Sequence, residues 1–255
     1  MKGHFLHVLK YAVLVISVCL SYQAVEAHDK GFKSNEFYEA MKRDVTGDKK
    51  IDTIELRGTP SEKNRHLLTK MELVVESNRK RMSIPLEAGY KPKLALADFN
   101  KDGVQDVFVS FQKQNKSELF HQIYSFDKGQ VANIEVPPSV PVTAQFQDYY
   151  MADITVEGQK PVRVDISSHR QVYEELGIYQ NGKLNEATEL IIHPYFELTV
   201  RSQFGRGKGL TGKQLVKGVE GEGAIATISS VWSFQDGAWK LIKANVKPLK
   251  KIKNR

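Results

Sequence analysis

The sequence predicts an all-β protein, built as a small propeller-like array of about four antiparallel blades with calcium-type acidic loops and few short helices. Three observations lead to this fold class. Acidic segments recur at nearly constant spacing, turn residues separate short runs of alternating apolar residues, and helical pattern is scarce. The 255 residues are 41% hydrophobic and 26% charged, which is typical of a globular chain. A twisted β-sandwich and an open array of blades are the alternative architectures.

The chain begins with the pattern of an export signal over residues 1–27. Two lysines precede the apolar run Tyr11–Leu20, and small residues stand three and one before a cut after Ala27. An uncleaved anchor and a lipoprotein attached through Cys19 are alternatives, but the apolar run is short and Val18 is bulky for lipidation. We therefore expect a secreted or exported protein at the cell surface, without a stable membrane span.

The mature chain, residues 28–255, is expected to form a single domain. It contains no cysteine, which excludes thiol catalysis, Cys–zinc sites and disulfides. The full chain has a net charge of +7, and losing Lys2, Lys10 and Glu26 with the signal leaves about +6.

Basic residues gather at the end of the chain, at Lys243, Lys247, Lys250, Lys251, Lys253 and Arg255. In an exported protein, this excess favours attraction to anionic cell-wall or spore-coat material, although a solvated tail would have the same composition. No recognisable nucleic-acid module carries the charge. Other surface proteins are possible partners, and the oligomeric state does not follow from the sequence.

Three similar acidic segments divide the chain into repeats. They are Asp44–Asp52, Asp98–Asp106 and Asp153–Pro161, and each is followed by an alternating apolar run. Repeats are therefore expected to start near residues 44, 98 and 153, with a last unit from about Phe196 that lacks an acidic segment.

Hairpins are expected between the acidic segments, because Asn-Gly, Asp-Gly or other turn residues separate runs of apolar alternation. The paired runs are Met71–Glu76 with Met82–Leu86, Phe120–Phe126 with Val131–Val136, and Ile228–Phe234 with Trp239–Ala244; a further turn follows Leu176–Tyr179. Helical pattern is limited to Asn35–Met41 and Ser168–Leu176.

The first two acidic segments carry the metal-binding chemistry. Oxygen ligands stand at alternate loop positions, which lets a tight loop wrap around one hard cation, and an all-oxygen set suits Ca²⁺. The expected ligands are Asp44, Thr46, Asp48, Asp52 and the Lys50 carbonyl in the first loop, and Asp98, Asn100, Asp102, Asp106 and the Val104 carbonyl in the second. Acidic residues chosen only for turn geometry would give a similar pattern.

These loops run into strands, unlike EF-hands, and they resemble the loops of FG-GAP or VCBS-type β-propeller repeats. The stretches Asp44–Gly58, Ile84–Ser110, Ile123–Phe126 and Val164–Tyr179 carry a closer resemblance to small exported FG-GAP/VCBS-repeat proteins of spore-forming Bacillus-like bacteria. The resemblance implies calcium in the loops, a propeller-like fold, no established enzymatic activity and, for some such proteins, association with the spore coat.

The three segments depart from the pattern to different degrees. Lys49 stands where the second loop has Gly103, at a position that often needs a left-handed backbone, and this costs about 1–2 kcal/mol. The third segment has Pro161 in place of the last carboxylate. The second site is therefore expected to be the stronger, the first weaker, and the third to bind no ion.

Other motifs are weaker. Gly207–Gln214 is close to a phosphate-binding loop, but Gln214 replaces the required hydroxyl, and the segment is interpreted as a flexible basic loop. No catalytic constellation emerges, so the sequence favours a non-catalytic calcium-binding protein that is structural or adhesive at the cell or spore surface. The alternative is a hydrolase or lyase acting on a surface polymer, with structural calcium.

Overall fold

The computed structural model describes residues 37–249 apart from 79, 116–117 and 204–206. The expected export signal, residues 1–27, lies outside the described residues. The described part is mostly β-structure, and its paired strands are antiparallel, as the sequence predicted. They form sheets of eight, three, two and four strands, and within the described ranges no propeller or closed sheet is found. The prediction of a propeller-like array of about four blades is therefore wrong, and the described strands form several open antiparallel sheets. In the part of the chain that the structure describes, no helix has the length and apolar character needed to cross a membrane.

The N-terminal half is an eight-stranded sheet in the order β1-β2-β3-β5-β6-β7-β8, with β4 paired to β3. Its strands are β1 (Phe37–Arg43), β2 (Asp52–Pro60), β3 (Leu67–Ser77), β4 (Lys80–Leu86), β5 (Gly89–Ala97), β6 (Asp106–Lys113), β7 (Leu119–Ser125) and β8 (Ala132–Ile134). A short 3₁₀ turn, η1 (Asp127–Gly129), precedes β8.

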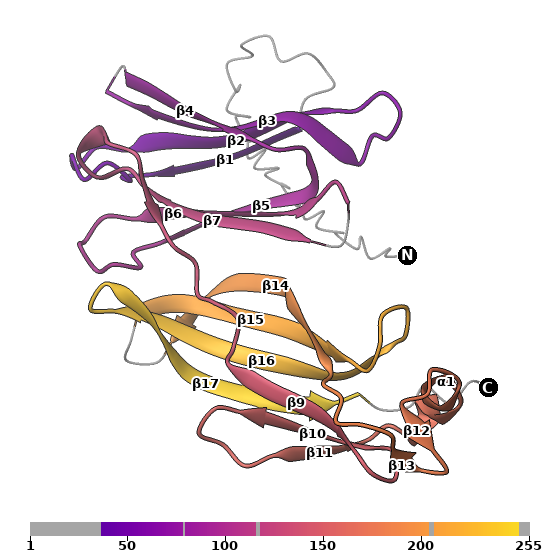
Figure 1. Cartoon of the computed structure of the whole chain (residues 1–255). Coiled ribbons are helices and arrows are strands. Elements are labelled where there is room, and N and C mark those ends of the chain that lie inside the picture. Colours follow the sequence, from indigo (N-terminus) through magenta and orange to yellow (C-terminus); the bar gives the residue numbers. More distant parts are fainter. Residues whose placement is uncertain (1–36, 79, 116–117, 204–206, 250–255) are drawn as a thin grey trace, which may run out of the picture. The chain divides into compact units, whose positions relative to one another are not determined.

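This sheet folds over on itself at β3. Most of β3 pairs with β4, whereas Leu67 and Leu68 pair with Tyr90 and Gly89 at the start of β5. Gly89 fits this corner because a Cβ there would lie 2.3 Å from the Phe111 ring. As a result, β1–β4 and β5–β7 form two layers (Figure 1).

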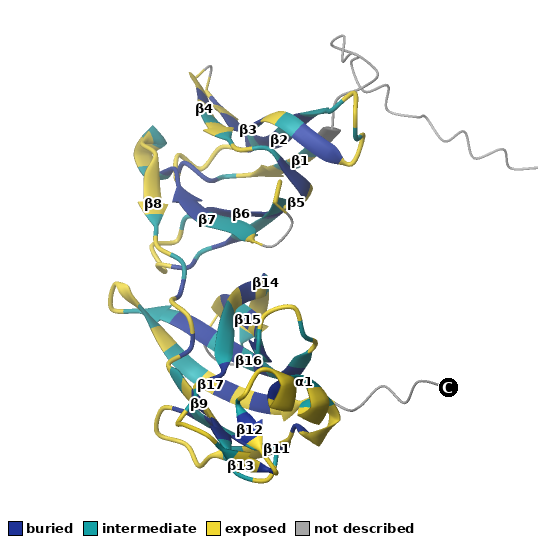
Figure 2. Cartoon of the chain, turned by 45° about the vertical axis from the view of Figure 1, so that its right-hand side comes forward, coloured by how far each residue is buried: buried dark blue, intermediate teal, exposed yellow. Residues whose placement is uncertain are grey.

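A buried apolar cluster lies between these two layers. Ile54, Leu56 and Leu73 come from the first layer, and Val109 and Phe111 come from the second. All five side chains are at most 1% exposed. Figure 2 shows buried residues along the strands of both layers.

The C-terminal half contains β9 (Val142–Gln147), β10 (Met151–Val156) and β11 (Val162–Asp165) in one sheet, and the small hairpin β12 (Tyr179–Gln180) with β13 (Lys183–Leu184). Between them lie the 3₁₀ turn η2 (Ser167–His169) and the helix α1 (Arg170–Glu175). The last sheet has the order β14 (Ile191–Gln203), β15 (Gly207–Lys217), β16 (Ala224–Gln235) and β17 (Ala238–Pro248).

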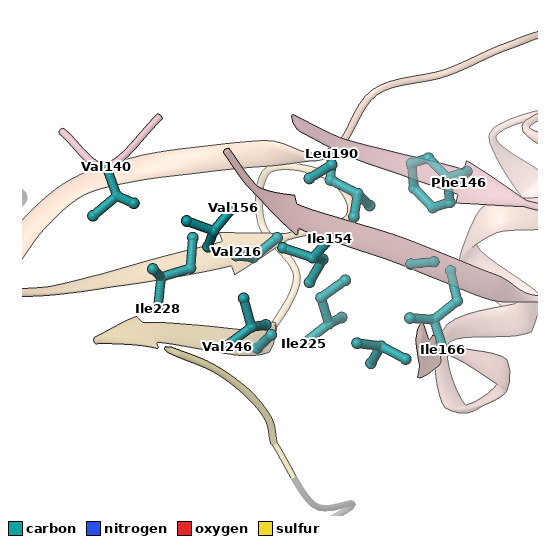
Figure 3. Close-up of a cluster of buried hydrophobic side chains, with 14 of the residues drawn as sticks. Val140, Phe146, Ile154, Val156, Ile166, Leu190, Val216, Ile225, Ile228 and Val246 are labelled. Atoms are coloured by element: carbon teal, nitrogen blue, oxygen red, sulfur yellow. The ribbon is translucent and has the colours of Figure 1, made fainter. Parts of the chain in front are cut away.

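A second apolar cluster joins the three-stranded and four-stranded sheets (Figure 3). It contains Phe146 and Ile154 from the smaller sheet and Val216, Ile228 and Val246 from the larger one. Its buried members all lie between Val140 and Val246. A smaller third cluster contains residues of β5–β7 together with Tyr195, Leu198 and Leu210.

The predicted hairpins are confirmed as β3–β4, β7–β8 and β16–β17. The turns Asn181-Gly182 and Asp236-Gly237 have positive φ at both residues, which is the geometry of a two-residue hairpin turn. The predicted helix at Ser168–Leu176 is also confirmed, as η2 followed by α1.

Two predictions of local structure are wrong. Asn35–Met41 was expected to be helical, but Phe37–Arg43 forms β1, because seven residues are too few to separate the two apolar periods. Gly207–Gln214 is part of strand β15 and not a flexible loop. Its Gly212 lies under the Tyr195 ring, where a Cβ would come within 2.3 Å.

Candidate metal-binding loops

The first two acidic segments occupy the same place in successive groups of strands. Asp44–Asp52 connects β1 to β2, and Asp98–Asp106 connects β5 to β6. The pairing that closes the first loop is Arg43 with Asp52, and the pairing that closes the second is Ala97 with Asp106. The last carboxylate of each loop is thus the first residue of the following strand.

Each of these last carboxylates is fully buried and turned back into its own loop. Asp52 accepts a hydrogen bond from the Val45 amide at 2.9 Å, and Asp106 accepts the equivalent bond from Phe99 at 2.9 Å. Both side chains are 0% exposed. In each case Oδ2 takes this bond, whereas Oδ1 is buried and accepts no hydrogen bond.

The first loop satisfies most of its carboxylate oxygens internally. Asp44 Oδ1 accepts from the amides of Thr46 and Gly47, and its Oδ2 accepts from Lys49. Asp48 accepts from the Lys50 amide and from the Asn78 side chain. The Thr46 hydroxyl donates a hydrogen bond to Asp52 Oδ2 at 3.1 Å. It also lies within hydrogen-bond distance of Ser77 Oγ, at 3.2 Å. Only Asp52 Oδ1 remains as a buried oxygen without a partner among the acidic side chains of this loop.

The second loop leaves two buried carboxylate oxygens without partners. Asp98 Oδ2 accepts from the Gly103 amide at 3.1 Å, but Asp98 Oδ1 is buried and unpaired, like Asp106 Oδ1. Asp102 accepts from the Val104 amide and from the Asn100 side chain. Buried carboxylate oxygens normally accept hydrogen bonds, so two exceptions within nine residues require an explanation.

Burial raises the pKa of the Asp106 carboxyl from 3.8 to about 6. The carboxylates of Asp102 and Asp98 raise it further, whereas hydrogen bonds from the Phe99 amide and the Ser125 hydroxyl oppose the rise. The second loop therefore concentrates negative charge where a proton or a cation would be stabilised.

Both loops use left-handed backbone at the same two positions, with glycine and lysine exchanged. The fourth position is Gly47 (φ 74°) in the first loop and Lys101 (φ 62°) in the second. The sixth position is Lys49 (φ 64°) and Gly103 (φ 89°), respectively. The predicted left-handed conformation at Lys49 is confirmed.

The two loops lie close together at one end of the sheet. A Cβ on Gly47 would lie 2.9 Å from Val104 Cγ2 and 3.1 Å from Asp127 Oδ1. The Lys128 amide donates to the Thr46 carbonyl at 2.9 Å, which ties η1 to the first loop. The sequence did not predict that Asn78 and Asp127 lie at this end of the sheet, because both belong to turns that only the strand order brings here.

The third acidic segment does not form an equivalent loop. Asp153 lies within β10 and receives two hydrogen bonds of 2.8 Å from the Arg163 side chain across the pair β10–β11. The ion pair with Arg163 lowers the pKa of the Asp153 carboxyl. Its carboxylate is therefore already neutralised by the protein.

The donor atoms of the second loop fit a hard cation in part. Among the described residues, no group of three or more His, Cys, Asp or Glu side chains is arranged closely enough to hold a metal ion. Asp98 and Asp106 nevertheless present unpaired carboxylate oxygens, and the loop also contains the Asn100 side chain and the Val104 carbonyl. The Asp102 carboxylate could join these ligands only by breaking its hydrogen bond with the Asn100 side-chain amide. An all-oxygen set of this kind suits Ca²⁺ better than zinc or copper.

Comparison with known families concerns the other half of the chain. Residues 140–247 match the family model of the YybI C-terminal domain. The expected resemblance to FG-GAP/VCBS repeat proteins is therefore wrong, since the family found is a different one. No curated protein and no solved structure gave a significant match.

The YybI C-terminal domain match coincides with a structural boundary. The apolar cluster of Figure 3 begins at Val140 and ends at Val246, within one residue of the ends of the match. The third acidic segment falls inside the matched region, where Asp153 lies in strand β10 and not in a third copy of the loops. The two candidate metal-binding loops lie outside it, at residues 44–106.

Proposed function

We propose that the mature chain is an exported, non-catalytic calcium-binding protein of the cell surface that attaches to anionic surface material. In this proposal the second loop is the stronger calcium site, and the ion stabilises the N-terminal sheet. The first loop is a weaker site. The association with the spore coat rested on the resemblance that the family match corrects, and it is not part of the proposal.

The main support for calcium binding is the pair of buried carboxylate oxygens on Asp98 and Asp106 that accept no hydrogen bond. Burying an ionised carboxylate with one oxygen unpaired is unfavourable, and a divalent cation between the two carboxylates would offset both this cost and their mutual repulsion. Because the first loop has one such oxygen and already satisfies Asp44 and Asp48, it has less to gain from an ion.

The charge of the chain supports the attachment part. The mature chain is expected to keep a net charge of about +6, and polyanions are the partners that such a charge attracts. The calcium and attachment parts are independent of each other and are tested separately.

Thermal unfolding of residues 28–255 tests the calcium part. Millimolar Ca²⁺ should raise the melting temperature over that in EDTA by a few degrees, and Mg²⁺ should raise it less. This corresponds to about 0.5–1.5 kcal/mol per site for a Kd of roughly 10⁻⁴–10⁻³ M. The absence of a response to Ca²⁺ would contradict calcium binding, and an equal response to the two ions would contradict the preference for calcium.

Two substitutions locate the site. Asp106→Asn should remove most of the calcium-dependent gain, because it removes the charge of one of the two carboxylates that have an unpaired oxygen. Asp153→Asn is the matched control, since Asp153 is bonded to Arg163 and lies in β10. The control should retain the full calcium response even if its ion-free stability changes. Equal losses in both variants would contradict the assignment to the second loop.

A further inference from the structure

The sheet β14–β17 has one face that covers the apolar clusters and one that does not. Directly paired residues share a face, and the pairs Gln214 with Ile228 and Ile228 with Val246 define the covered one. Tyr195, Leu198 and Leu210, which belong to the third cluster, lie on this same face by their pairings. The opposite face is thus the outer face of the sheet.

Basic and hydroxyl side chains dominate this outer face. One row across the sheet is Thr199, Thr211, Val231 and Lys243; the next is Glu197, Lys213, Ser229 and Asn245; a third is Leu215, Thr227 and Lys247. Arg201, Lys217 and Lys240 fall on the same face by strand alternation. None of these residues is buried.

The outer face is positively charged as a whole. In the rows just given, Glu197 is the acidic member among the described residues, and it is paired with Lys213 at 3.1 Å. Lys217 is paired with Glu220 at 3.7 Å, so on the described part of this face the uncompensated charges are those of Arg201, Lys240, Lys243 and Lys247. Lys243 and Lys247 are exposed on the edge strand β17 and stand four residues apart, about 13 Å along the strand. The charges are therefore spread across a surface and do not converge on one point, as a site for a small ion would require.

Hydroxyl groups lie between these charges. Thr199 and Thr211 are hydrogen-bonded through their side chains at 3.0 Å, and Thr227 and Ser229 continue the polar strip on the central strand β16. Hydroxyl groups both donate and accept hydrogen bonds, so they can pair with the hydroxyl groups of a sugar or polyol. On β15, β16 and β17, the described residues of this face include no aromatic side chain on which a nucleic-acid base could stack.

We propose that this outer face of β14–β17 binds an anionic polyol polymer, meaning a chain of sugar or polyol units that carry acidic groups. The inference rests on the attachment part of the proposed function and names the surface that performs it. Lysines of the face neutralise the acidic groups, and the hydroxyl strip contacts the polyol backbone between them.

Binding to dextran sulfate tests the proposal, with uncharged dextran as the control for the polymer backbone. Residues 28–255 should bind immobilised dextran sulfate at low ionic strength, be released by salt, and not bind dextran. Lys243→Gln with Lys247→Gln should weaken this binding about five- to tenfold. Lys63→Gln with Lys160→Gln removes the same charge from exposed lysines elsewhere and should change binding less than twofold. Melting curves of both variants confirm that they are folded.

Each outcome has a separate meaning. If the unmodified chain does not bind dextran sulfate, the attachment part of the proposed function fails, and this inference fails with it. If it binds but the two double variants lose affinity equally, net charge suffices and the outer face is not the binding surface. If neutralising Lys250, Lys251 and Lys253 abolishes binding while Lys243→Gln with Lys247→Gln does not, the tail is the binding segment. Equal affinity for single-stranded DNA of similar charge would overturn the polyol part.

Discussion

At the scale of single residues, the two acidic loops reach one backbone conformation by different sequences. Positive φ is needed at the fourth and sixth positions, and each loop provides glycine at one of them and lysine at the other. The sequence predicted the strain at Lys49 from its alignment with Gly103. It did not predict the one at Lys101, although the same alignment places Lys101 opposite Gly47.

Alanine at the two glycines should separate backbone strain from contact between the loops. Gly47→Ala and Gly103→Ala each introduce a Cβ at positive φ, at a cost of about 1–2 kcal/mol. Only Gly47→Ala also brings that atom to 2.9 Å from Val104, whereas a Cβ on Gly103 meets nothing within 4 Å. Urea unfolding in EDTA should therefore show the larger loss, by about 1 kcal/mol or more, for Gly47→Ala. Equal losses would mean that the two loops do not touch.

The raised pKa of Asp106 predicts how ion-free stability depends on pH. Because this carboxyl binds its proton more tightly in the folded state, stability is greatest where it is protonated and falls as pH rises from about 4 to about 6. Urea unfolding in EDTA across this range should show the fall, and Asp106→Asn should reduce it. The Asp153 carboxyl has a lowered pKa and contributes with the opposite sign at lower pH. A rise in stability over pH 4–6 that Asp106→Asn leaves unchanged would contradict the prediction.

At the scale of elements, local sequence patterns predicted the hairpins and the helical segment, because these elements depend on residues that are close in the sequence. Turn residues predicted the hairpins, and the helical pattern of Ser168–Leu176 predicted the segment that contains α1. Long-range pairing was not predictable: β3 divides its hydrogen bonds between β4 and β5, and this division produces two layers where successive blades were expected. The same pairing brings Asn78 and Asp127 to the candidate site from distant turns.

Helix α1 is held to the C-terminal core by Tyr173, whose hydroxyl is buried without a hydrogen-bond partner. Burial raises the pKa of Tyr173 to about 12. Tyr173→Phe should therefore stabilise the protein, by up to about 1 kcal/mol, because it removes an unsatisfied polar atom and keeps the ring. Tyr179→Phe is the matched control: the Tyr179 hydroxyl donates to the Gln147 carbonyl at 2.7 Å, so its loss should cost about 1 kcal/mol. Chemical denaturation of both variants measures the difference, and a loss of stability in Tyr173→Phe would contradict it.

At the scale of the whole molecule, the chemistry is divided along the chain. The acidic loops belong to residues 44–106, and the basic outer face belongs to the region that matches the YybI C-terminal domain. The constant spacing of acidic segments suggested one repeating architecture for the whole chain. It could not reveal this division, because the third segment has a similar composition but different strand partners.

The C-terminal region should fold by itself. Residues 138–255 contain the complete apolar cluster from Val140 to Val246, so this fragment should unfold cooperatively on heating. It should show no calcium-dependent change in melting temperature, because both loops are absent. Circular dichroism with EDTA and with Ca²⁺ tests both statements, and a calcium response in the fragment would place a metal site outside the two loops.

Strand β17 ends the four-stranded sheet and pairs only with β16 among the described strands. Its outer backbone groups could therefore extend a ladder into a second protein molecule, which is how exposed sheet edges promote aggregation. Lys240, Lys243 and Lys247 place charges along this edge, and a neighbouring copy would bring like charges against them. The lysines that we assign to polymer binding would thus also oppose edge-to-edge pairing of separate molecules. Neutralising them should lower the protein concentration at which copies of the chain begin to associate.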